Sequence, residues 1–382
     1  MANTNTNVTP QLLAQGLMAL RQRAITARLV NRGYESLAAE KGNVINIPVP
    51  SAIAARAVTP AVTMNSNVDS APTTVAVTLD QWYEAPFHLS DNDALTVMNG
   101  FIPMQASEAI KALANNVDSF ILGKHTGVYS GGGTAGTTPF ATAIAAAATA
   151  RVLLNKQLAP PDDRRAILDP SAEGNLLSLS NILQFDQRGD QGGIVQGMIG
   201  HKLGVDWYMN QNVPSYTPGT GWASGNIAST VAGAVGDTTL NIINATASGT
   251  IKVGDIFTLT ADTASQQYAV TVAATISATV AVAISFTPAL KTTVATGATL
   301  IVVSLPYVAN LMFHRDAFAF ASRPLAQSNA AAGNIFTSQV DPVSGLALRL
   351  EISRQFKQDT YSYDILYGAK LVRAELATKI FG

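Results

Sequence analysis

The chain has 382 residues, of which 47% are hydrophobic and 13% are charged, and 24 Lys and Arg residues oppose 25 Asp and Glu residues. The net charge of −1 excludes a protein that grips nucleic acid tightly along its whole length, because such proteins carry a basic surplus. The absence of cysteine excludes disulfides, thiolate nucleophiles and cysteine-bound metal clusters. The low charge leaves much uncharged surface, which suits contact with partner subunits and equally suits an Ala-rich soluble protein.

No targeting or membrane segment is expected. The first residues, "MANTNTNVTPQLL", lack the basic and apolar regions of a signal peptide, and the chain has no strongly apolar run of 18 residues. We therefore expect a soluble protein.

Residues 1–43 are predicted to form an N-terminal arm with one amphipathic helix. Thr9 and Pro10 suit the helix start, and Gly33 suits its end. One predicted face is apolar and the other basic, with the members Leu13, Leu17, Leu20, Ala24 and Ala27 against Arg21, Arg28 and Arg32. The basic face indicates either solvation or contact with an acidic partner or nucleic acid.

A long hairpin is predicted next. The strand-like stretches "VINIPV" (44–49) and "TTVAVTLDQW" (73–82) flank a proline-containing segment without a strong pattern, which we expect to be a loose tip around residues 52–71. Because an extended arm is costly in isolation, this hairpin is expected to pack on a neighbouring chain.

A long amphipathic helix is predicted over residues 103–123, where one face repeats at helical spacing and the polar residues face elsewhere. The apolar members are Ile110, Leu113, Val117, Phe120 and Ile121, and the polar ones are Lys111, Asn115 and Asp118. The Gly-rich stretch "YSGGGTAGTTP" (129–139) lacks the Gly-Lys-Ser/Thr ending of a phosphate-binding loop and is interpreted as a linker. These features begin a mixed α/β region.

Alternating helices and strands continue to residue 214. We predict a helix over 138–160, a buried strand over 164–170, a helix over 171–183 with Ser171 as its N-cap, and short strands over 197–214. This order indicates a compact α/β domain.

The composition changes between Ser215 and Ser304, where Arg and Glu are absent. The charges there are few, namely Asp237, Lys252, Asp255, Asp262 and Lys291. Short alternating stretches such as "IKVGDIFTLT" and "QQYAVTV" predict five or six strands, so this segment is expected to be a small β-barrel or sandwich inserted into a surface loop of the α/β host. Mixed structure returns at 306–325, and two antiparallel strands are predicted at 345–356 and within 358–380.

The search for catalytic chemistry identifies no candidate catalytic, cofactor-binding or metal-binding residue. The histidines His88, His125, His201 and His314 do not stand at i, i+3 or i, i+4 spacing, and each is interpreted as structural. "HRD" at 314–316 lacks the remainder of a kinase catalytic loop. Asp91 and Asp93 in "SDNDA" lack the Gly and Glu of a calcium loop and are interpreted as helix N-capping residues.

The order of these parts resembles the major capsid proteins of tailed phages with the HK97 fold, and most closely the P22 coat-protein family. The phrases that carry the resemblance are "NVINIPVP", "TTVAVTLDQWYEAPFHLSD", "KALANNVD", "RRAILDP", "MFHRDAFAFASRPL" and "YSYDILYGAKLVRAELATKIFG".

The resemblance implies an α+β fold with an N-terminal arm, an E-loop, a P-domain, an A-domain and an inserted all-β domain. The implied boundaries are 1–43 for the arm, 44–90 for the E-loop hairpin, 91–137 plus 323–382 for the P-domain with spine helix 103–123, 138–214 plus 305–322 for the A-domain, and 215–304 for the insert. We hypothesise that the insert stabilises the subunit or its capsomer.

The implied function is that of a coat protein rather than an enzyme. Its copies would form hexamers and pentamers of an icosahedral shell around double-stranded DNA, which they would contact only weakly and non-specifically. A scaffolding protein and a portal are expected partners, a decoration protein is a conceivable one, and a membrane is not. The expected location is the virion, and the host cytoplasm during assembly.

Two departures limit what the resemblance implies. No lysine lies between Lys41 and Lys111, so the covalent crosslinking of some related shells is not expected in the E-loop. The insert also has too few charges for the charged loop contacts of the P22 insertion domain. Two alternatives stay open. One is an encapsulin-like compartment shell. The other is a secreted β-rich binding protein, which the predicted helices outside the β-rich segment do not favour.

Overall fold

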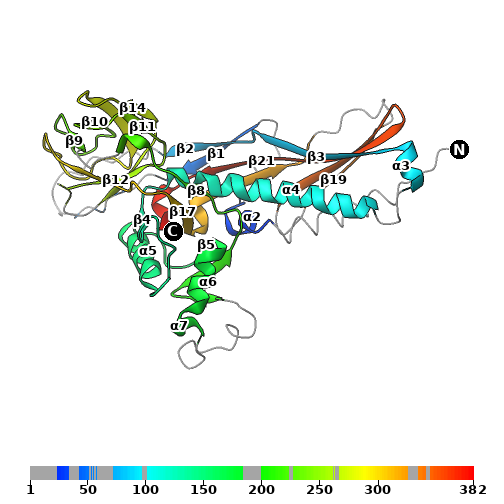
Figure 1. Ribbon diagram of the computed structural model, residues 1–382, viewed down its shortest axis with the longest axis horizontal. Helices are drawn as coiled ribbons and strands as arrows, with labels where there is room; N and C mark the ends of the chain where they lie inside the picture. The colour runs from blue at the N-terminus through cyan, green and yellow to red at the C-terminus, as the bar shows by residue number, and fades with distance from the viewer. Residues whose placement is uncertain are drawn as a thin grey trace. The chain divides into compact units, whose positions relative to one another are not determined.

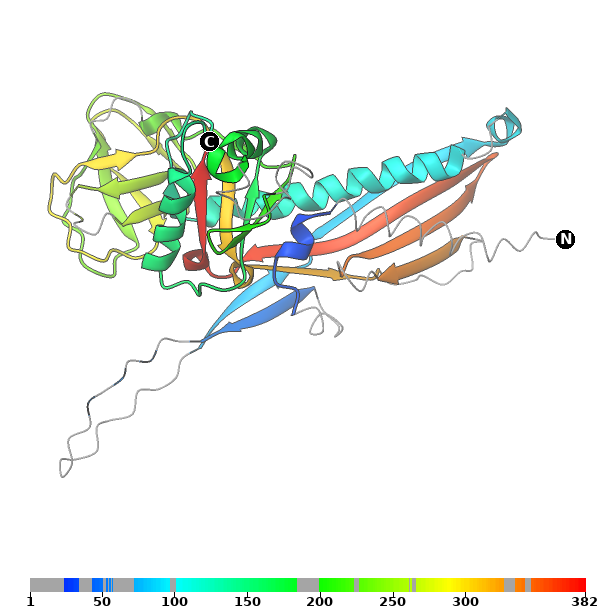
Figure 2. The ribbon, with the colours of Figure 1, turned by 90° about the horizontal axis from the view of Figure 1, so that it is seen from below.

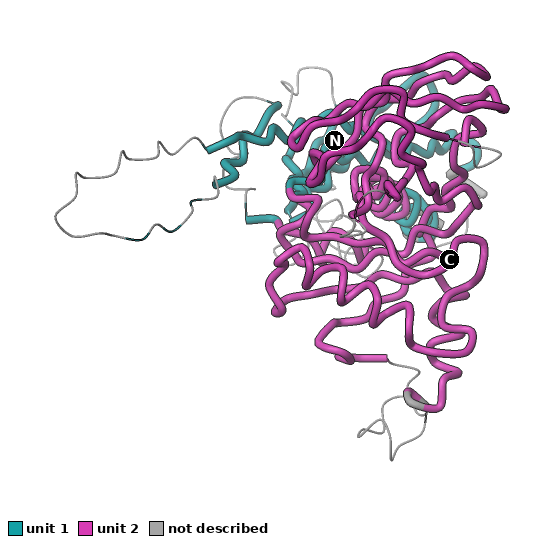
Figure 3. The backbone as a smooth tube through the Cα atoms, turned by 90° about the vertical axis from the view of Figure 1, so that its left-hand side faces the viewer, with its two compact units in different colours: residues 1–22, 32–113, 319–372 teal, residues 23–31, 114–318, 373–382 magenta. Residues whose placement is uncertain are grey.

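The computed structural model describes residues 24–33, 43–50, 53, 55, 57, 72–96, 101–183, 199–222, 227–260, 262, 266–325, 334–340 and 345–382. The chain divides into two compact units (Figure 3). Unit 1 comprises residues 1–22, 32–113 and 319–372, and unit 2 comprises residues 23–31, 114–318 and 373–382.

Unit 1 contains a two-stranded antiparallel hairpin (Figure 2). Strand β1 (Val44–Val49) pairs with β2 (Thr73–Thr78), so that Val44 lies opposite Thr78 and Val49 opposite Thr73. Alternation places one face in a small core, formed by Ile45, Ile47, Val77, Leu79, Ala319 and Ala321. The predicted pairing of 44–49 with the stretch that starts at residue 73 is confirmed.

Unit 1 also contains strands of a five-stranded antiparallel sheet (Figure 1). Its members are β3 (Gln81–Ser90), β18 (Phe318–Arg323), β19 (Ile335–Val340), β20 (Ala347–Gln355) and β21 (Gln358–Leu371), in the order β18-β21-β20-β19 with β3 also on β21. Strand β3 pairs with β21 from Ser90–Gln358 to Gln81–Tyr367. The hairpin predicted to reach residue 90 therefore ends at Thr78, because residues 81–90 pair with the long strand β21 instead.

The predicted long helix is confirmed as α4 (Phe101–Gly123), which begins in unit 1 and ends in unit 2. Its buried positions include Ile110, Leu113, Val117 and Ile121, as the spacing predicts, whereas Phe120 is half-buried. The expectation that Asp118 faces away from the apolar side is wrong, because this carboxylate is buried. A short helix, α3 (Asp91–Thr96), precedes it.

Unit 2 contains a second sheet, in which the C-terminal residues form an inner strand. Its members are β4 (Gly131–Gly132), β22 (Ala377–Phe381), β17 (Tyr307–His314), β5 (Arg164–Leu168), β7 (Val205–Met209) and β6 (His201–Lys202) in this order, with β8 (Ser215–Tyr216) also on β17. Strand β22 pairs with β17 and β4, and residues 373–382 lie in unit 2. Residues 319–322 of β18 lie in unit 1.

The described helices that lie wholly in unit 2 are α2 (Thr26–Leu29), α5 (Ala145–Lys156), α6 (Pro170–Ser178) and α7 (Ser180–Leu183). Helix α5 is shorter than the predicted 138–160, and the predicted helix over 171–183 is divided into α6 and α7. Asp169 caps α6 by accepting a hydrogen bond from the Ser171 backbone N–H at 3.0 Å, so the predicted cap at Ser171 is wrong. An Asp carboxylate followed by proline at the first helical position is a strong helix start.

The predicted N-terminal helix lies mostly outside the described residues. Within them, α2 ends at Leu29 because Val30 is extended, and not at Gly33 as predicted.

Residues 227–302 form an antiparallel β-barrel, called the barrel below. Its strands are β9 (Ile227–Ser229), β10 (Thr239–Asn244), β12 (Ile256–Leu259), β13 (Gln267–Val270), β15 (Val282–Thr287) and β16 (Leu300–Val302), in the order β16-β12-β13-β15-β10-β9. A bridge between Ala228 and Thr299 joins the two end strands and closes the sheet. A smaller pair, β11 (Gly249–Ile251) with β14 (Ala274–Ile276), accompanies it.

Aromatic rings fill the barrel core. Phe257 lies with its ring centroid 5.5 Å from those of Tyr268 and Phe286, and these two are 5.4 Å apart. Trp222, on the 3-10 turn η3 (Thr220–Trp222), stacks on Phe257 at 6.2 Å. Such pairs contribute about 0.5–1.5 kcal/mol each beyond the burial of their area, so the barrel has a core of its own.

Candidate functional site

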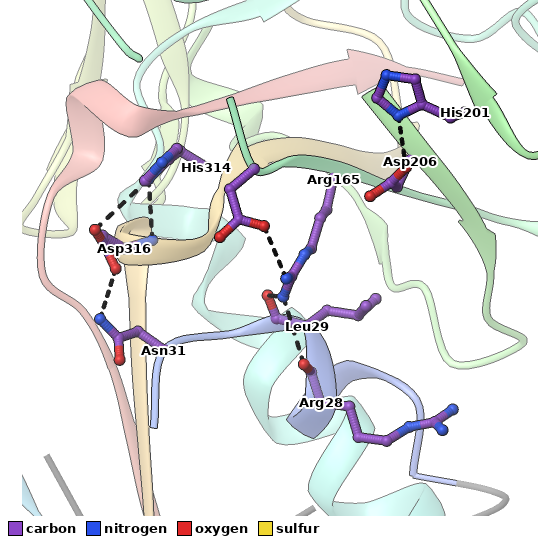
Figure 4. Close-up of polar contacts among 9 residues, drawn as sticks. Arg28, Leu29, Asn31, Arg165, His201, Asp206, His314 and Asp316 are labelled. Carbon is purple, nitrogen blue, oxygen red and sulfur yellow. Dashed lines mark hydrogen bonds and ion pairs between the residues drawn. The ribbon is translucent and has the colours of Figure 1, made fainter. Parts of the chain in front are cut away.

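The residues considered for catalysis lie on separate elements. His88 is exposed on β3, and His201 is an exposed residue whose ring lies 2.7 Å from Asp206 (Figure 4). His314 accepts a hydrogen bond from the backbone N–H of Asp316 and so caps the 3-10 turn formed by the "HRD" triplet. In the part of the chain that the structure describes, no three His, Asp or Glu side chains gather as metal ligands.

No helix in the described part of the chain is both long enough and apolar enough to cross a membrane.

Asp91 and Asp93 take part in contacts at the start of α3. The Ser90 hydroxyl accepts from the backbone N–H of Asp93 at 3.2 Å and donates to its carboxylate at 2.6 Å, so Ser90 is the cap and Asp93 completes the reciprocal pair. Asp91 instead binds Arg354 at 2.7 Å, and Arg354 also lies 3.0 Å from Asp359. The hydrogen bond from Arg354 lowers the pKa of Asp91. The side chain that caps α3 is therefore that of Ser90, and the interpretation of the two aspartates as the capping residues is wrong.

One face of the unit 1 sheet carries a cluster of charges. Arg349 lies opposite Asp364 in the β20–β21 register, and its Nε donates to that carboxylate at 3.1 Å. Glu84 lies opposite Asp364 on the other neighbouring strand and accepts from the Ser362 hydroxyl at 3.2 Å. Glu351 lies 3.5 Å from Arg349. Two carboxylates contact the Arg349 guanidinium, and Glu84 lies on the next strand beyond Asp364, so this cluster has more negative than positive groups.

Large apolar side chains of unit 1 stand in solvent. Trp82 is 63% exposed and Tyr83 is 42% exposed, on opposite faces of β3, and Phe356 is 88% exposed at the β20–β21 turn. Ile335 and Val340, at the two ends of β19, are each 46% exposed. We call these five residues the unit 1 apolar surface. Exposed aromatic groups on strands are typical of surfaces that contact another chain.

Polar contacts hold residues 25–31 within unit 2 (Figure 4). The Arg165 guanidinium donates to the Leu29 carbonyl at 2.6 Å and lies 3.0 Å from Asp163. The Asn31 amide donates to Asp316 at 2.6 Å. This part of the predicted N-terminal arm is therefore held through both a backbone carbonyl and a side chain.

Asp118 of α4 binds the start of the same segment. Its carboxylate, buried to 1% exposure, accepts from the backbone N–H groups of Ile25 at 3.2 Å and Thr26 at 3.0 Å and from the Asn210 amide at 2.7 Å. Burial nevertheless raises the pKa of Asp118 to about 6 against these hydrogen bonds. A distant residue thus caps α2, whose own Ile25 supplies no side-chain cap.

A buried lysine joins the C-terminal strand to the barrel. Lys379 of β22 has no exposed surface, and its Nζ lies 3.4 Å from both the Gly254 carbonyl and the Tyr307 hydroxyl. The rings of Tyr216 and Tyr307 lie 5.9 and 5.8 Å from the same atom. Burial lowers the pKa of Lys379 to about 7, and the charge of Asp255 opposes this effect.

Asp255 is the matching buried carboxylate on the barrel side. It accepts from the Trp222 indole at 2.6 Å, from the Lys252 backbone N–H at 2.7 Å, from the Tyr216 hydroxyl at 2.8 Å and from the Gly219 backbone N–H at 3.2 Å. Four donors, three from residues 216–222 and one from Lys252, converge on one side chain. Asp255 therefore fixes the chain where it enters the barrel.

The neighbouring Gly254 permits a close approach. Its φ is +94°, a conformation that favours glycine, and a Cβ there would lie 2.9 Å from Cβ of Thr126. His125, on the same 3-10 turn as Thr126, places its ring edge-on to Tyr216 at 5.6 Å. Burial, together with the charge of Lys379, lowers the pKa of His125 to about 4. These contacts pack the 3-10 turn closely against the start of the barrel.

Asp118 was expected on the polar side of its helix, Lys379 had no predicted role, and Asp255 was counted only as a charge. The signal that could have found them is a single charged residue within an apolar run, as in "NVDSFIL", "VGDIFTL" and "ATKIFG". A charge in such a run is buried with a partner, because an unpaired buried charge is strongly unfavourable.

No family model and no curated protein matches the chain. Solved structures do. A structure of Mycobacterium phage Che8 is 18% identical, with a TM-score of 0.52 over 92% of this chain and 89% of that chain. The capsid structure of Cyanophage P-SCSP1u is 12% identical, with a TM-score of 0.46 over 89% and 84%. A virus-like particle from Pyrococcus furiosus is 7% identical, with a TM-score of 0.45 over 97% and 98%. The likeness to the Che8 structure shows a shared fold over almost the whole chain.

Proposed function

We propose that this chain is the major capsid protein of a tailed phage, with the HK97 fold. The observation that carries the proposal is the shared fold with a phage protein over 92% of the chain. The sequence phrases that resemble phage coat proteins, distributed from residue 43 to the C-terminus, support it independently. Copies of the chain form hexamers and pentamers of an icosahedral shell that encloses double-stranded DNA in the virion.

The elements acquire roles under this proposal. The β1–β2 hairpin is the base of the E-loop, α4 is the spine helix, and the five-stranded sheet is the P-domain. The sheet of unit 2 is the A-domain, with β22 returning to it from the C-terminus. The barrel is the inserted domain, held to its host by Lys379 and Asp255.

The exposed groups of unit 1 support a role in assembly. Burying Trp82 and Phe356 against neighbouring copies contributes about 1.5–3 kcal/mol for each large apolar side chain. A single contact of this size is weak, but a closed shell repeats it in every subunit. Assembly in the host cytoplasm with a scaffolding protein and a portal follows from the same proposal, as does weak contact with the packaged DNA.

The proposal is tested by expressing the chain alone and examining it by negative-stain electron microscopy and sedimentation. Closed shells, tubes or polyheads tens of nanometres across are expected from a chain that curves without help. A chain that stays monomeric at high concentration and also with the products of its neighbouring genes would contradict the proposal. Nucleic acid inside particles from infected cells separates a phage capsid from a cargo-filled compartment.

A further inference from the structure

A second feature of unit 2 lies between helix α5 and the barrel. A cavity of about 350 Å³ is lined by Leu153, Lys156 and Gln157 of the helix region and by Ser130, Gln266, Gln267 and Lys291 from the other segments. This volume is at the lower end of the range of small-ligand sites. The lining has two ammonium groups and no carboxylate.

We propose that this cavity binds a phosphate-class oxyanion. Two positive side chains that line one cavity repel each other, and an anion between them removes the repulsion. Among the described residues, neither Lys156 nor Lys291 has an ion-pair partner. Both lysines are exposed enough to turn toward a ligand.

The polar floor of the cavity is rigid. Gln267 donates to the Gly131 carbonyl at 2.8 Å and accepts from its backbone N–H at 2.6 Å. The Ser130 hydroxyl donates to the Ala377 carbonyl at 3.0 Å. Gln266 donates to the Gln267 carbonyl at 2.9 Å. These groups shape the cavity, and the lysines supply the charge for a ligand.

One lining atom points to a ligand that also donates a hydrogen bond. The Gln157 side-chain carbonyl oxygen is buried and has no hydrogen-bond partner. A protonated phosphate offers both oxygens that accept from lysine and a hydroxyl that donates to this oxygen. If the amide is turned over, its N–H₂ group donates to the anion instead, which serves the same ligand.

Two nearby groups carry negative charge, but neither neutralises the two lysines. The C-terminal end of α5 at Lys156 carries about half a negative charge, which offsets only part of one lysine. Asp262 does not line the cavity, and its carboxylate accepts from the Gln266 backbone N–H at 3.2 Å and the Tyr268 hydroxyl at 3.3 Å. The two lysines therefore favour a negatively charged ligand in this cavity.

The test measures binding of inorganic phosphate to the full chain by isothermal titration calorimetry at pH 7, with chloride keeping the ionic strength constant. The K156Q/K291Q double variant is expected to lose on the order of tenfold in affinity for each lysine removed. The matched control is Lys252→Gln, because that side chain belongs to the same barrel segment but donates to the Thr217 carbonyl outside the cavity. It is expected to bind like the original chain.

A second arm distinguishes the source of the phosphate. A short single-stranded oligonucleotide without terminal phosphates replaces inorganic phosphate, and binding that depends on the same two lysines would identify a nucleic-acid phosphodiester as the ligand. Equal affinities in the original chain and the double variant, or no binding of either probe, would overturn the proposal. Because both substitutions are at exposed positions, circular dichroism is expected to show unchanged folding. Shell formation is scored separately, so failure of this site leaves the proposed function intact.

Discussion

The barrel and the five-stranded sheet of unit 1 are both antiparallel, but they complete their surfaces differently. The barrel joins its end strands through Ala228 and Thr299 and surrounds an aromatic core. The unit 1 sheet has the exposed strands β3 and β19, with Trp82 and Ile335 in solvent. A closed sheet satisfies its edges within one chain, whereas an open sheet with apolar groups at its edges gains stability from another chain. The barrel should therefore be stable by itself, and the sheet should depend on assembly.

The largest expected effect comes from breaking the barrel core. Phe257→Ala removes a ring that contacts Trp222, Tyr268 and Phe286, and we expect a loss of about 3–5 kcal/mol in the free energy of unfolding. Urea unfolding monitored by tryptophan fluorescence, to which the barrel contributes Trp222, measures it. Val280→Ala, at a barrel position that is 57% exposed, is the control and should change the stability by less than about 0.5 kcal/mol. Equal effects of the two substitutions would show that the barrel lacks an independent core.

The second prediction concerns the entry to the barrel. Asp255→Ala leaves the Trp222 indole and the buried Gly219 backbone N–H without their acceptor, and we expect a loss of about 2–4 kcal/mol. Asp237→Ala is the matched control. This carboxylate is exposed and accepts a hydrogen bond from the Ala234 backbone N–H at 2.7 Å. Thermal unfolding of both variants makes the comparison. A loss for Asp255→Ala no larger than that for Asp237→Ala would contradict the anchoring role.

The third prediction uses pH. The pKa of Lys379 is lowered from 10.5 to about 7 in the folded chain, so between these values the unfolded chain holds a proton that the folded chain does not. The folded state therefore gains stability as pH rises from 7 to 9, by at most about 1.4 kcal/mol per pH unit. Lys379→Met should abolish this gain. Urea unfolding at pH 7, 8 and 9 measures it, and an identical slope in the variant would show that Lys379 keeps its proton when buried.

The smallest effect on the isolated chain is expected at the exposed sheet. Trp82→Ser should change the free energy of unfolding by less than about 0.5 kcal/mol, because the side chain is 63% exposed. It should nevertheless lower the yield of assembled particles in sedimentation. Substitution of the exposed Val272 of the barrel segment by Ser, at 58% exposure, is the control and should leave that yield unchanged. The contrast fails if both variants assemble alike.

Local patterns were enough to predict the elements with strong periodicity. The α4 helix follows from its apolar spacing, and the β20–β21 pair follows from alternation on either side of a turn. The strand-rich character of residues 215–304 follows from composition and alternation together. In each case the signal lies within about 20 residues, where side-chain periodicity reports directly on burial.

Long-range pairing could not be predicted in the same way. Strand β22 pairs with β4 across more than 240 residues, and β3 pairs with β21 although its sequence continues the preceding hairpin. A strand carries its face in its sequence but not its neighbour. The Lys379–Asp255 centre was missed for the same reason, since each residue appears as a lone charge until the fold brings the two segments together.

The pairing of β8 with β17 places Tyr216 opposite Tyr307, so the two ends of the segment that contains the barrel meet in one sheet. The length of that segment can change without moving the register of β17. The buried lysine limits such changes, because Lys379 takes its opposing charge from Asp255 within the segment. In any related chain without a barrel we therefore expect an apolar residue in place of the lysine, and in any chain that has the lysine we expect the aspartate.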